Sequence, residues 1–63
     1  MKYKVLKHFQ WGRLKLEKDQ IILITESDNT NSLVSINHYP EKSQLINSKA
    51  IQGMISLKKI ERY

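Results

Sequence analysis

The sequence predicts an all-β fold: a small barrel-like or curled antiparallel meander of five to six short strands, with one helical turn near residues 48–52. Three observations carry this prediction. Apolar and polar side chains alternate with the period of two that marks a strand, both near the N-terminus and over residues 33–39. An aliphatic, mostly β-branched run occupies Ile21–Ile24. Residue types that favour turns separate these segments.

Two strands are expected in the first part of the chain. Over residues 2–9, aromatic or aliphatic side chains alternate with Lys and His, and residues 6–7 interrupt the pattern where we expect a bulge or a half-exposed edge. Leu14 and Leu16 occupy positions of the opposite parity, which requires a turn or bulge in between. Phe9-Gln10-Trp11-Gly12 fits a type I turn, because glycine is favoured at its fourth position.

The middle of the chain predicts two further strands. Ile21–Ile24 has no polar face, so we expect a central strand that is covered on both sides. Ser, Asp, Asn and Thr crowd residues 27–32 and predict a turn. The next strand is expected over Leu33–Tyr39, and Pro40 is expected to end it because proline cannot donate a hydrogen bond to a sheet.

The last third of the chain allows two interpretations. In the first, a short strand at Gln44–Ile46 precedes a helical turn at Ser48–Gln52, Gly53 stops that turn, and a final strand covers Ile55–Lys59. In the second, one C-terminal helix begins at about residue 43 and follows the β-meander, with apolar residues at helical spacing. We favour the first, because the glycine and several isoleucines lower helix propensity and no capping box marks a helix start.

The expected core combines the aliphatic strand with the apolar residues of its neighbours. Its members are Val5, Phe9, Leu14, Leu16, Ile21–Ile24, Val34 and Ile36. Such a meander is typical of small barrels of the SH3-like, Sm-like and OB types. This is an analogy of architecture only, since the sequence contains no family motif.

The length of 63 residues predicts a single domain, residues 1–63, with a marginal core, because a chain of this size buries only about 60% of its unfolded surface. No cysteine is present, so neither a disulfide nor a thiolate metal site adds stability. We therefore expect a homo-oligomer. The longest aliphatic run is Ile21–Ile24 and no apolar segment follows the basic start, so we expect a cytoplasmic protein without a membrane segment.

Catalysis, metal binding and cofactor binding have no support in the sequence. The two histidines, His8 and His38, stand far apart, and the acidic residues are scattered among turns and strand ends. Phosphate-binding loops need clustered glycines, whereas Gly12 and Gly53 stand alone. We expect neither an enzyme, nor a metal site, nor a bound cofactor.

Charge is distributed unevenly along the chain, whose formal net charge is +5. Residues 1–18 carry +5, residues 19–47 carry −3 and residues 48–63 carry +3. Basic ends with an acidic middle indicate a polyanionic partner, while a Lys-rich soluble surface is the plain alternative.

Nucleic acid, either DNA or RNA, is the partner that this pattern favours. If the first two strands pair through a turn at Gly12, their outward basic side chains form one surface, and a last strand that returns beside the first adds Lys58 or Lys59. Trp11 at the tip of that hairpin is the candidate for stacking on a base, whereas Phe9 is assigned to the core. Phosphate contacts from such a surface would tolerate any sequence and would weaken with salt. The candidate binding residues are Lys2, Lys4, His8, Trp11, Arg13, Lys15 and Lys58.

A protein partner is the alternative. A short β-rich domain with exposed edges can assemble with itself or add a strand to a larger protein, as a small regulator or inhibitor does. Richness in Lys, Ile and Asn is typical of AT-rich genomes and fits a low-GC bacterium or its phage. Charge reversal at Lys4, Arg13 and Lys15 separates the two hypotheses, because it should abolish nucleic-acid binding and leave an apolar protein interface intact.

Overall fold

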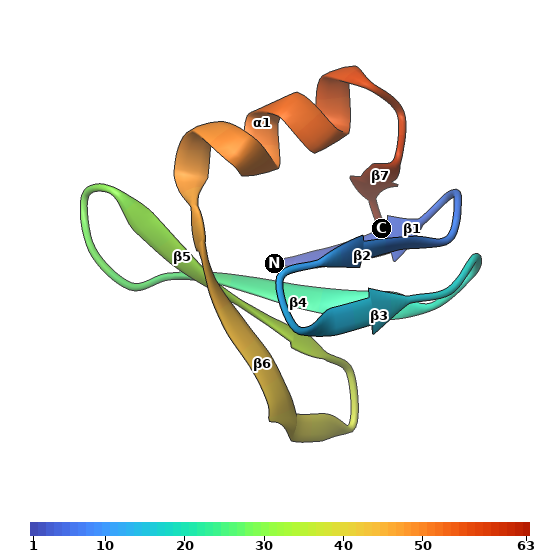
Figure 1. The fold of residues 1–63 in the computed structure, drawn as a ribbon, viewed down its shortest axis with the longest axis horizontal. Coiled ribbons are helices and arrows are strands. Elements are labelled where there is room, and N and C mark those ends of the chain that lie inside the picture. The colour runs from blue at the N-terminus through green and yellow to red at the C-terminus, as the bar shows by residue number, and fades with distance from the viewer.

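Seven strands and one helix make up most of the chain in the computed structural model, which describes residues 1–63 (Figure 1). In chain order the elements are β1 (Lys2–Val5), β2 (Phe9–Trp11), β3 (Leu14–Leu16), β4 (Ile21–Glu26), β5 (Asn31–Ile36), β6 (Tyr39–Asn47), α1 (Ser48–Ser56) and β7 (Ile60–Arg62). The predicted all-β class is confirmed, with more strands than expected and a longer helix.

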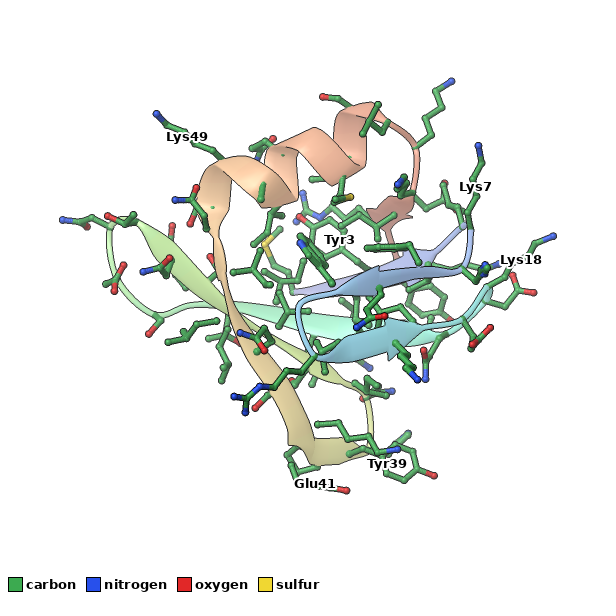
Figure 2. All side chains as sticks on the ribbon, in the orientation of Figure 1. Tyr3, Lys7, Lys18, Tyr39, Glu41 and Lys49 are labelled. Carbon is green, nitrogen blue, oxygen red and sulfur yellow. The ribbon has the colours of Figure 1, made fainter.

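Five of the strands form one antiparallel sheet in the order β6-β5-β4-β1-β7. β2 and β3 form a separate hairpin, inserted in the chain between the neighbouring strands β1 and β4. The sheet is curled, and the hairpin and α1 lie on its inner side (Figure 1), with side chains of both layers filling the space between them (Figure 2). The last strand returns beside the first, as expected for a barrel-like fold, and places Ile60 opposite Val5.

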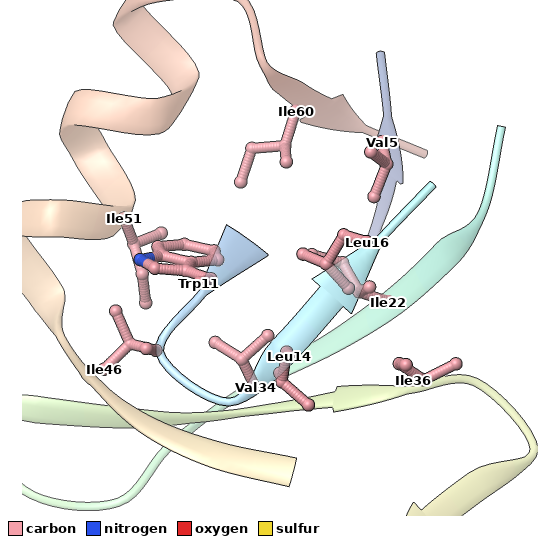
Figure 3. Close-up of a cluster of buried hydrophobic side chains, with 10 residues drawn as sticks. All are labelled: Val5, Trp11, Leu14, Leu16, Ile22, Val34, Ile36, Ile46, Ile51 and Ile60. Atoms are coloured by element: carbon pink, nitrogen blue, oxygen red, sulfur yellow. The ribbon is translucent and has the colours of Figure 1, made fainter. Parts of the chain in front are cut away.

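The core fills the space between the inner face of the sheet and the layer of hairpin and helix (Figure 3). Val5, Ile22 and Val34 have 0% of their surface exposed, because alternate positions of each strand face inward. The ten buried apolar side chains are Val5, Trp11, Leu14, Leu16, Ile22, Val34, Ile36, Ile46, Ile51 and Ile60. Phe9, which the sequence assigned to the core, is only half-buried and packs against its margin.

The turn at Gly12 joins β2 to β3 rather than closing a longer first strand. Trp11 and Leu14 are directly opposite each other, which leaves Gly12 and Arg13 as a two-residue loop. Of these two only Gly12 has a positive φ, +60°, which corresponds to a type II′ turn with glycine first in the loop. The predicted type I turn over residues 9–12 is therefore wrong, because β2 already occupies Phe9–Trp11.

β4 contains the aliphatic run of the sequence, but only one of its faces is covered. Ile22 is fully buried and faces the core, whereas Ile21 and Leu23 are half-exposed on the outer face of the sheet. The expected strand covered on both sides is wrong for the single chain, because the hairpin and the helix both lie on the inner side (Figure 1).

β5 and β6 form a hairpin with an irregular end. β5 stops at Ile36, Asn37 and His38 make the turn, and His38 adopts a left-handed φ of 71°. The predicted strand Leu33–Tyr39 was therefore too long, and Pro40 does not end it but is the second residue of β6. Proline is tolerated there because β6 is an edge strand and the register of pairing shifts beside it.

α1 is longer than the predicted turn and starts later than the alternative helix. Asn47 caps its N-terminus, since the side-chain Oδ1 accepts a hydrogen bond from the backbone N–H of Lys49 at 2.8 Å, and the residues before it remain in β6. Ile51 anchors the helix in the core, and this burial outweighs the cost of about 1 kcal/mol that Gly53 brings to a helix interior. The order strand, helix, strand is right, whereas the final strand moves from Ile55–Lys59 to β7.

The end of α1 is closed by the backbone. Lys58 has a left-handed φ of 57°, and its N–H donates to the carbonyl of Ile55 at 3.0 Å, while the N–H of Lys59 donates to the carbonyl of Met54 at 3.0 Å. The helix has nine residues, and no helix of the structure is long and apolar enough to cross a membrane.

Candidate nucleic-acid interface

The hairpin β2–β3 carries the two aromatic residues on which the nucleic-acid hypothesis depended, and their positions are the reverse of those expected. Trp11 has 6% of its surface exposed and packs in the core next to Ile51 (Figure 3). A buried ring offers no face to a base, so the assignment of Trp11 as the stacking residue is wrong. Trp11 belongs to the same buried cluster as Leu14, its partner across the hairpin, and Ile51 of α1.

Phe9 is the aromatic residue that stays accessible. It is half-exposed, and a groove of about 260 Å³ opens beside it, lined by His8, Gln10, Lys15, Leu16 and Glu17. The Nζ of Lys59 lies 5.6 Å from the centre of the Phe9 ring, within the range of a cation–π contact. An accessible aromatic ring therefore lies among basic side chains from three different segments. We call this site the Phe9 groove.

A second, larger groove of about 460 Å³ lies between the hairpin and β6. Arg13, Lys15 and Lys42 line it, together with one acidic residue, Glu41. Gln44 fixes the hairpin against β6, because its Oε1 accepts a hydrogen bond from the backbone N–H of Arg13 at 3.4 Å. Lys15 lines both grooves and so connects them.

Three loops that are distant in the sequence meet at one end of the molecule. The N–H of Leu6 donates to the carbonyl of Lys59 at 2.8 Å, and the N–H of Asp19 donates to the carbonyl of Val5 at 2.8 Å. These bonds join the β1–β2 loop to the segment before β7 and the β3–β4 turn to β1. The charged or titratable residues of this basic end are Lys7, His8, Lys18, Lys58 and Lys59, against Glu17 and Asp19. Figure 2 shows Lys7 and Lys18 there and Lys49 at the opposite end.

Lys2 and Lys4 do not belong to this surface. β1 pairs with β4 and β7 and not with the hairpin, so the expected basic surface across the first strand and the strand after Gly12 is wrong. Tyr3 and Val5 pack on the core side, which places both lysines on the outer face of the sheet. The candidates that do lie along the hairpin or at the basic end are His8, Arg13, Lys15 and Lys58.

None of the cations of the hairpin and the basic end forms a salt bridge. The pair between Lys4 Nζ and Asp19 Oδ1, at 3.5 Å, is the one salt bridge of the structure, and it involves the outer face. Asp28 lies in the β4–β5 turn, where hydrogen bonds from the backbone N–H groups of Asn31 and Thr30 hold the pKa of its carboxyl below the usual value. This carboxylate accepts hydrogen bonds within its own turn and neutralises no cation of the grooves.

Phe9 and Lys42, which line the grooves, and Lys59, which lies over the Phe9 ring, were not among the candidate binding residues from sequence. The adjacent Lys58 and Lys59 indicated that the last part of the chain adds a cation to the surface, but the sequence could not show which of them lies over an aromatic ring. The position of Lys42 depends on the irregular pairing in β6, which no local pattern reveals.

No group of three or more His, Cys, Asp or Glu side chains is placed to hold a metal ion. His8 lines the Phe9 groove and His38 occupies the β5–β6 turn, so the two histidines contribute to different parts of the surface. No protein-family model, no curated protein and no solved structure matches this chain.

Proposed function

We propose that this protein is a non-catalytic nucleic-acid-binding domain, which contacts single-stranded DNA or RNA through the hairpin β2–β3 and the basic end. The observation that carries the proposal is the half-exposed ring of Phe9, in a groove lined by His8 and Lys15, with Lys59 Nζ 5.6 Å from the ring centre. This arrangement supplies both parts of a single-strand site, an aromatic face for a base and cations for the neighbouring phosphates. Single strands are favoured because only an unpaired base exposes its face for stacking.

The two grooves give such a strand a continuous path. A base on Phe9 places its phosphate near Lys15, and the backbone then continues past Arg13 and Lys42 in the second groove. Contacts of this kind are made to phosphates and to the face of a base, and they read no base edge. Binding is accordingly expected to tolerate any sequence and to be strongly salt-dependent.

The test is the fluorescence anisotropy of labelled oligonucleotides titrated with protein across a salt series. If Arg13, Lys15 and Lys59 each neutralise one phosphate, the logarithm of the binding constant falls with the logarithm of salt with a slope of about −2 for single strands. Lys15→Glu should weaken binding to all sequences alike and reduce the steepness of that slope by about 0.7. Phe9→Leu, which keeps an apolar side chain, should weaken binding by about 1–3 kcal/mol if a base stacks on the ring.

Lys49→Glu is the matched control, because it makes the same charge change at the opposite end of the molecule (Figure 2). It should leave the affinity almost unchanged. Equal weakening by Lys15→Glu and Lys49→Glu would reduce the effect to net charge, and an absence of binding at low salt would refute the proposal.

A protein partner is the second candidate, either a larger protein that this chain regulates or further copies of itself. It is favoured by apolar side chains that remain exposed on the outer face of the sheet, including Leu33 and Leu45. Because that face is opposite the hairpin, the two candidate functions use different surfaces and can be tested separately.

A further inference from the structure

A second exposed aromatic ring, that of Tyr39, borders the second groove. Tyr39 is 52% exposed and is the first residue of β6, directly opposite Ile36 of β5. Residues opposite each other in an antiparallel pair share one face of the sheet, and Ile36 lines the second groove. Figure 2 shows the Tyr39 side chain beside Glu41, at the β5–β6 turn. The ring therefore lies on the side of the sheet that faces the hairpin.

Tyr39 and Phe9 are each paired with a lysine in the same way. The Nζ of Lys42 lies 5.4 Å from the centre of the Tyr39 ring, and the Nζ of Lys59 lies 5.6 Å from the centre of the Phe9 ring. Both distances are in the range of a cation–π contact. The molecule thus carries two accessible rings with an ammonium group beside each, and this combination suits one base and one phosphate of a single strand.

The Phe9 groove and the second groove connect the two rings. Phe9 lines the first groove, Lys15 lines both, and Lys42, which lines the second, is the cation beside Tyr39. The second groove holds three cations, since Arg13 also lines it, against a single carboxylate. A polyanion that follows the grooves therefore meets a ring, then an excess of positive charge, then a second ring.

The backbone holds the Tyr39 ring in place. His38, the residue before it, adopts a left-handed φ of 71° in the β5–β6 turn. Pro40, the residue after it, has a fixed φ and restricts Tyr39 itself to an extended backbone. A tyrosine has few rotatable bonds, so a ring on a constrained backbone loses little conformational entropy when it binds a ligand.

We propose that Tyr39 is a second base-stacking residue, so that one single strand spans both grooves with one base on Phe9 and another on Tyr39. This inference rests on the proposed function and adds to it a ligand length. The longest extent of the molecule is 28 Å, so the path between the rings is short. The site should cover about 4–6 nucleotides, at the lower end of the range of small single-strand-binding domains.

The test is the anisotropy of a labelled thymine oligonucleotide of about 8 nucleotides, long enough to span the site, titrated at low salt. Tyr39→Leu should weaken binding by at least about 5-fold, the low end of what one stacked base contributes, and Phe9→Leu should do the same. Tyr39→Phe should bind like the wild type, because stacking needs the ring and not the hydroxyl group. Circular dichroism melts of both Tyr39 variants should match the wild type, because this side chain is exposed.

An abasic strand of the same length separates stacking from charge. It keeps every phosphate but offers no base, so Tyr39→Leu should bind it as the wild type does. Tyr63→Leu is the matched control, because Tyr63 is 73% exposed but lines neither groove. Its backbone N–H donates to the carbonyl of Lys2 at 3.0 Å, which places it beside β1. This variant should bind both strands like the wild type.

Three results overturn the inference and leave the proposed function standing. In the first, Tyr39→Leu binds the thymine strand as tightly as the wild type while Phe9→Leu binds it more weakly. In the second, Tyr39→Leu weakens the thymine and abasic strands equally. In the third, Tyr63→Leu weakens binding as much as Tyr39→Leu. A wild type that binds neither strand at low salt refutes the proposed function and this inference with it.

Discussion

Lys58 ends α1 in a backbone conformation that favours glycine. Its φ is 57°, and the N–H groups of Lys58 and Lys59 donate to the carbonyls of Ile55 and Met54, the two hydrogen bonds of a Schellman motif. A residue with a Cβ in the left-handed region carries a cost of about 1–2 kcal/mol. The greater freedom of glycine in the unfolded chain offsets about 0.4–1 kcal/mol of this. Lys58→Gly should therefore raise the free energy of unfolding by about 0.5–1 kcal/mol.

Thermal and urea unfolding, followed by circular dichroism, measure this effect directly. For a domain of this size, 1 kcal/mol corresponds to about 4–8 °C in the midpoint of thermal unfolding, so a rise of several degrees is expected. Lys58→Ala removes the same charge but keeps the Cβ, and should not be more stable than the wild type. If the glycine variant is no more stable than the alanine variant, the backbone at Lys58 is not strained and the argument is refuted.

Lys58→Gly and Lys58→Ala also distinguish the effect of charge on nucleic-acid binding from the effect of stability. Lys58 lies at the basic end, and both variants lose its ammonium group. If this group contacts a phosphate, both should bind more weakly than the wild type and by similar factors, although one is more stable and the other is not. Anisotropy titrations at low salt provide the comparison. Binding that follows stability instead of charge would remove Lys58 from the interface.

Two further predictions concern the turns. Gly12→Ala should lower the free energy of unfolding by about 1–2 kcal/mol, because φ is +60° and a Cβ would lie 3.0 Å from the side chain of Gln44. Urea unfolding measures this loss. A loss no larger than that of an ordinary surface substitution would contradict the assigned turn. Asp28 has a folded-state pKa below 3.8, so its stabilisation is fully present above pH 3.8 and is lost as pH falls through the lower, folded-state pKa. The Asp28→Asn variant should therefore lose less stability than the wild type as the pH is lowered. Urea midpoints measured from neutral to acid pH provide the comparison. Identical pH profiles for variant and wild type would contradict the role given to the Asp28 carboxylate in the turn.

Much of the local structure could be predicted from the sequence. The alternation near the N-terminus, the aliphatic run at Ile21–Ile24 and the glycine at the hairpin turn all depend on neighbours a few residues away. Period-two patterns and turn chemistry are set by the pleat of a strand and by allowed φ values, which need no knowledge of distant segments. For the same reason, Leu14, Leu16, Val34 and Ile36 were correctly assigned to the core.

The pairing of strands and the covering of their faces were decided only by the tertiary structure. β1 lies between β4 and β7, so Lys2 and Lys4 are separated from the basic residues of the hairpin. Local patterns show which residues share a face, but they do not show which neighbour covers it. The helix was also longer than its propensity indicated, because burial of Ile51 depends on a sheet assembled from the rest of the chain.

Phe9 and Trp11 show this limit most directly. They are two residues apart on β2 and therefore share one face of the strand. The sequence placed Phe9 inside and left Trp11 for a ligand. In the fold, Trp11 is buried in the core cluster with Ile51 of α1 (Figure 3), whereas Phe9 stays half-exposed with the side chain of Lys59 over its ring. Alternation alone determined that both rings lie on one face; the position of the helix decided which ring is buried and which remains accessible.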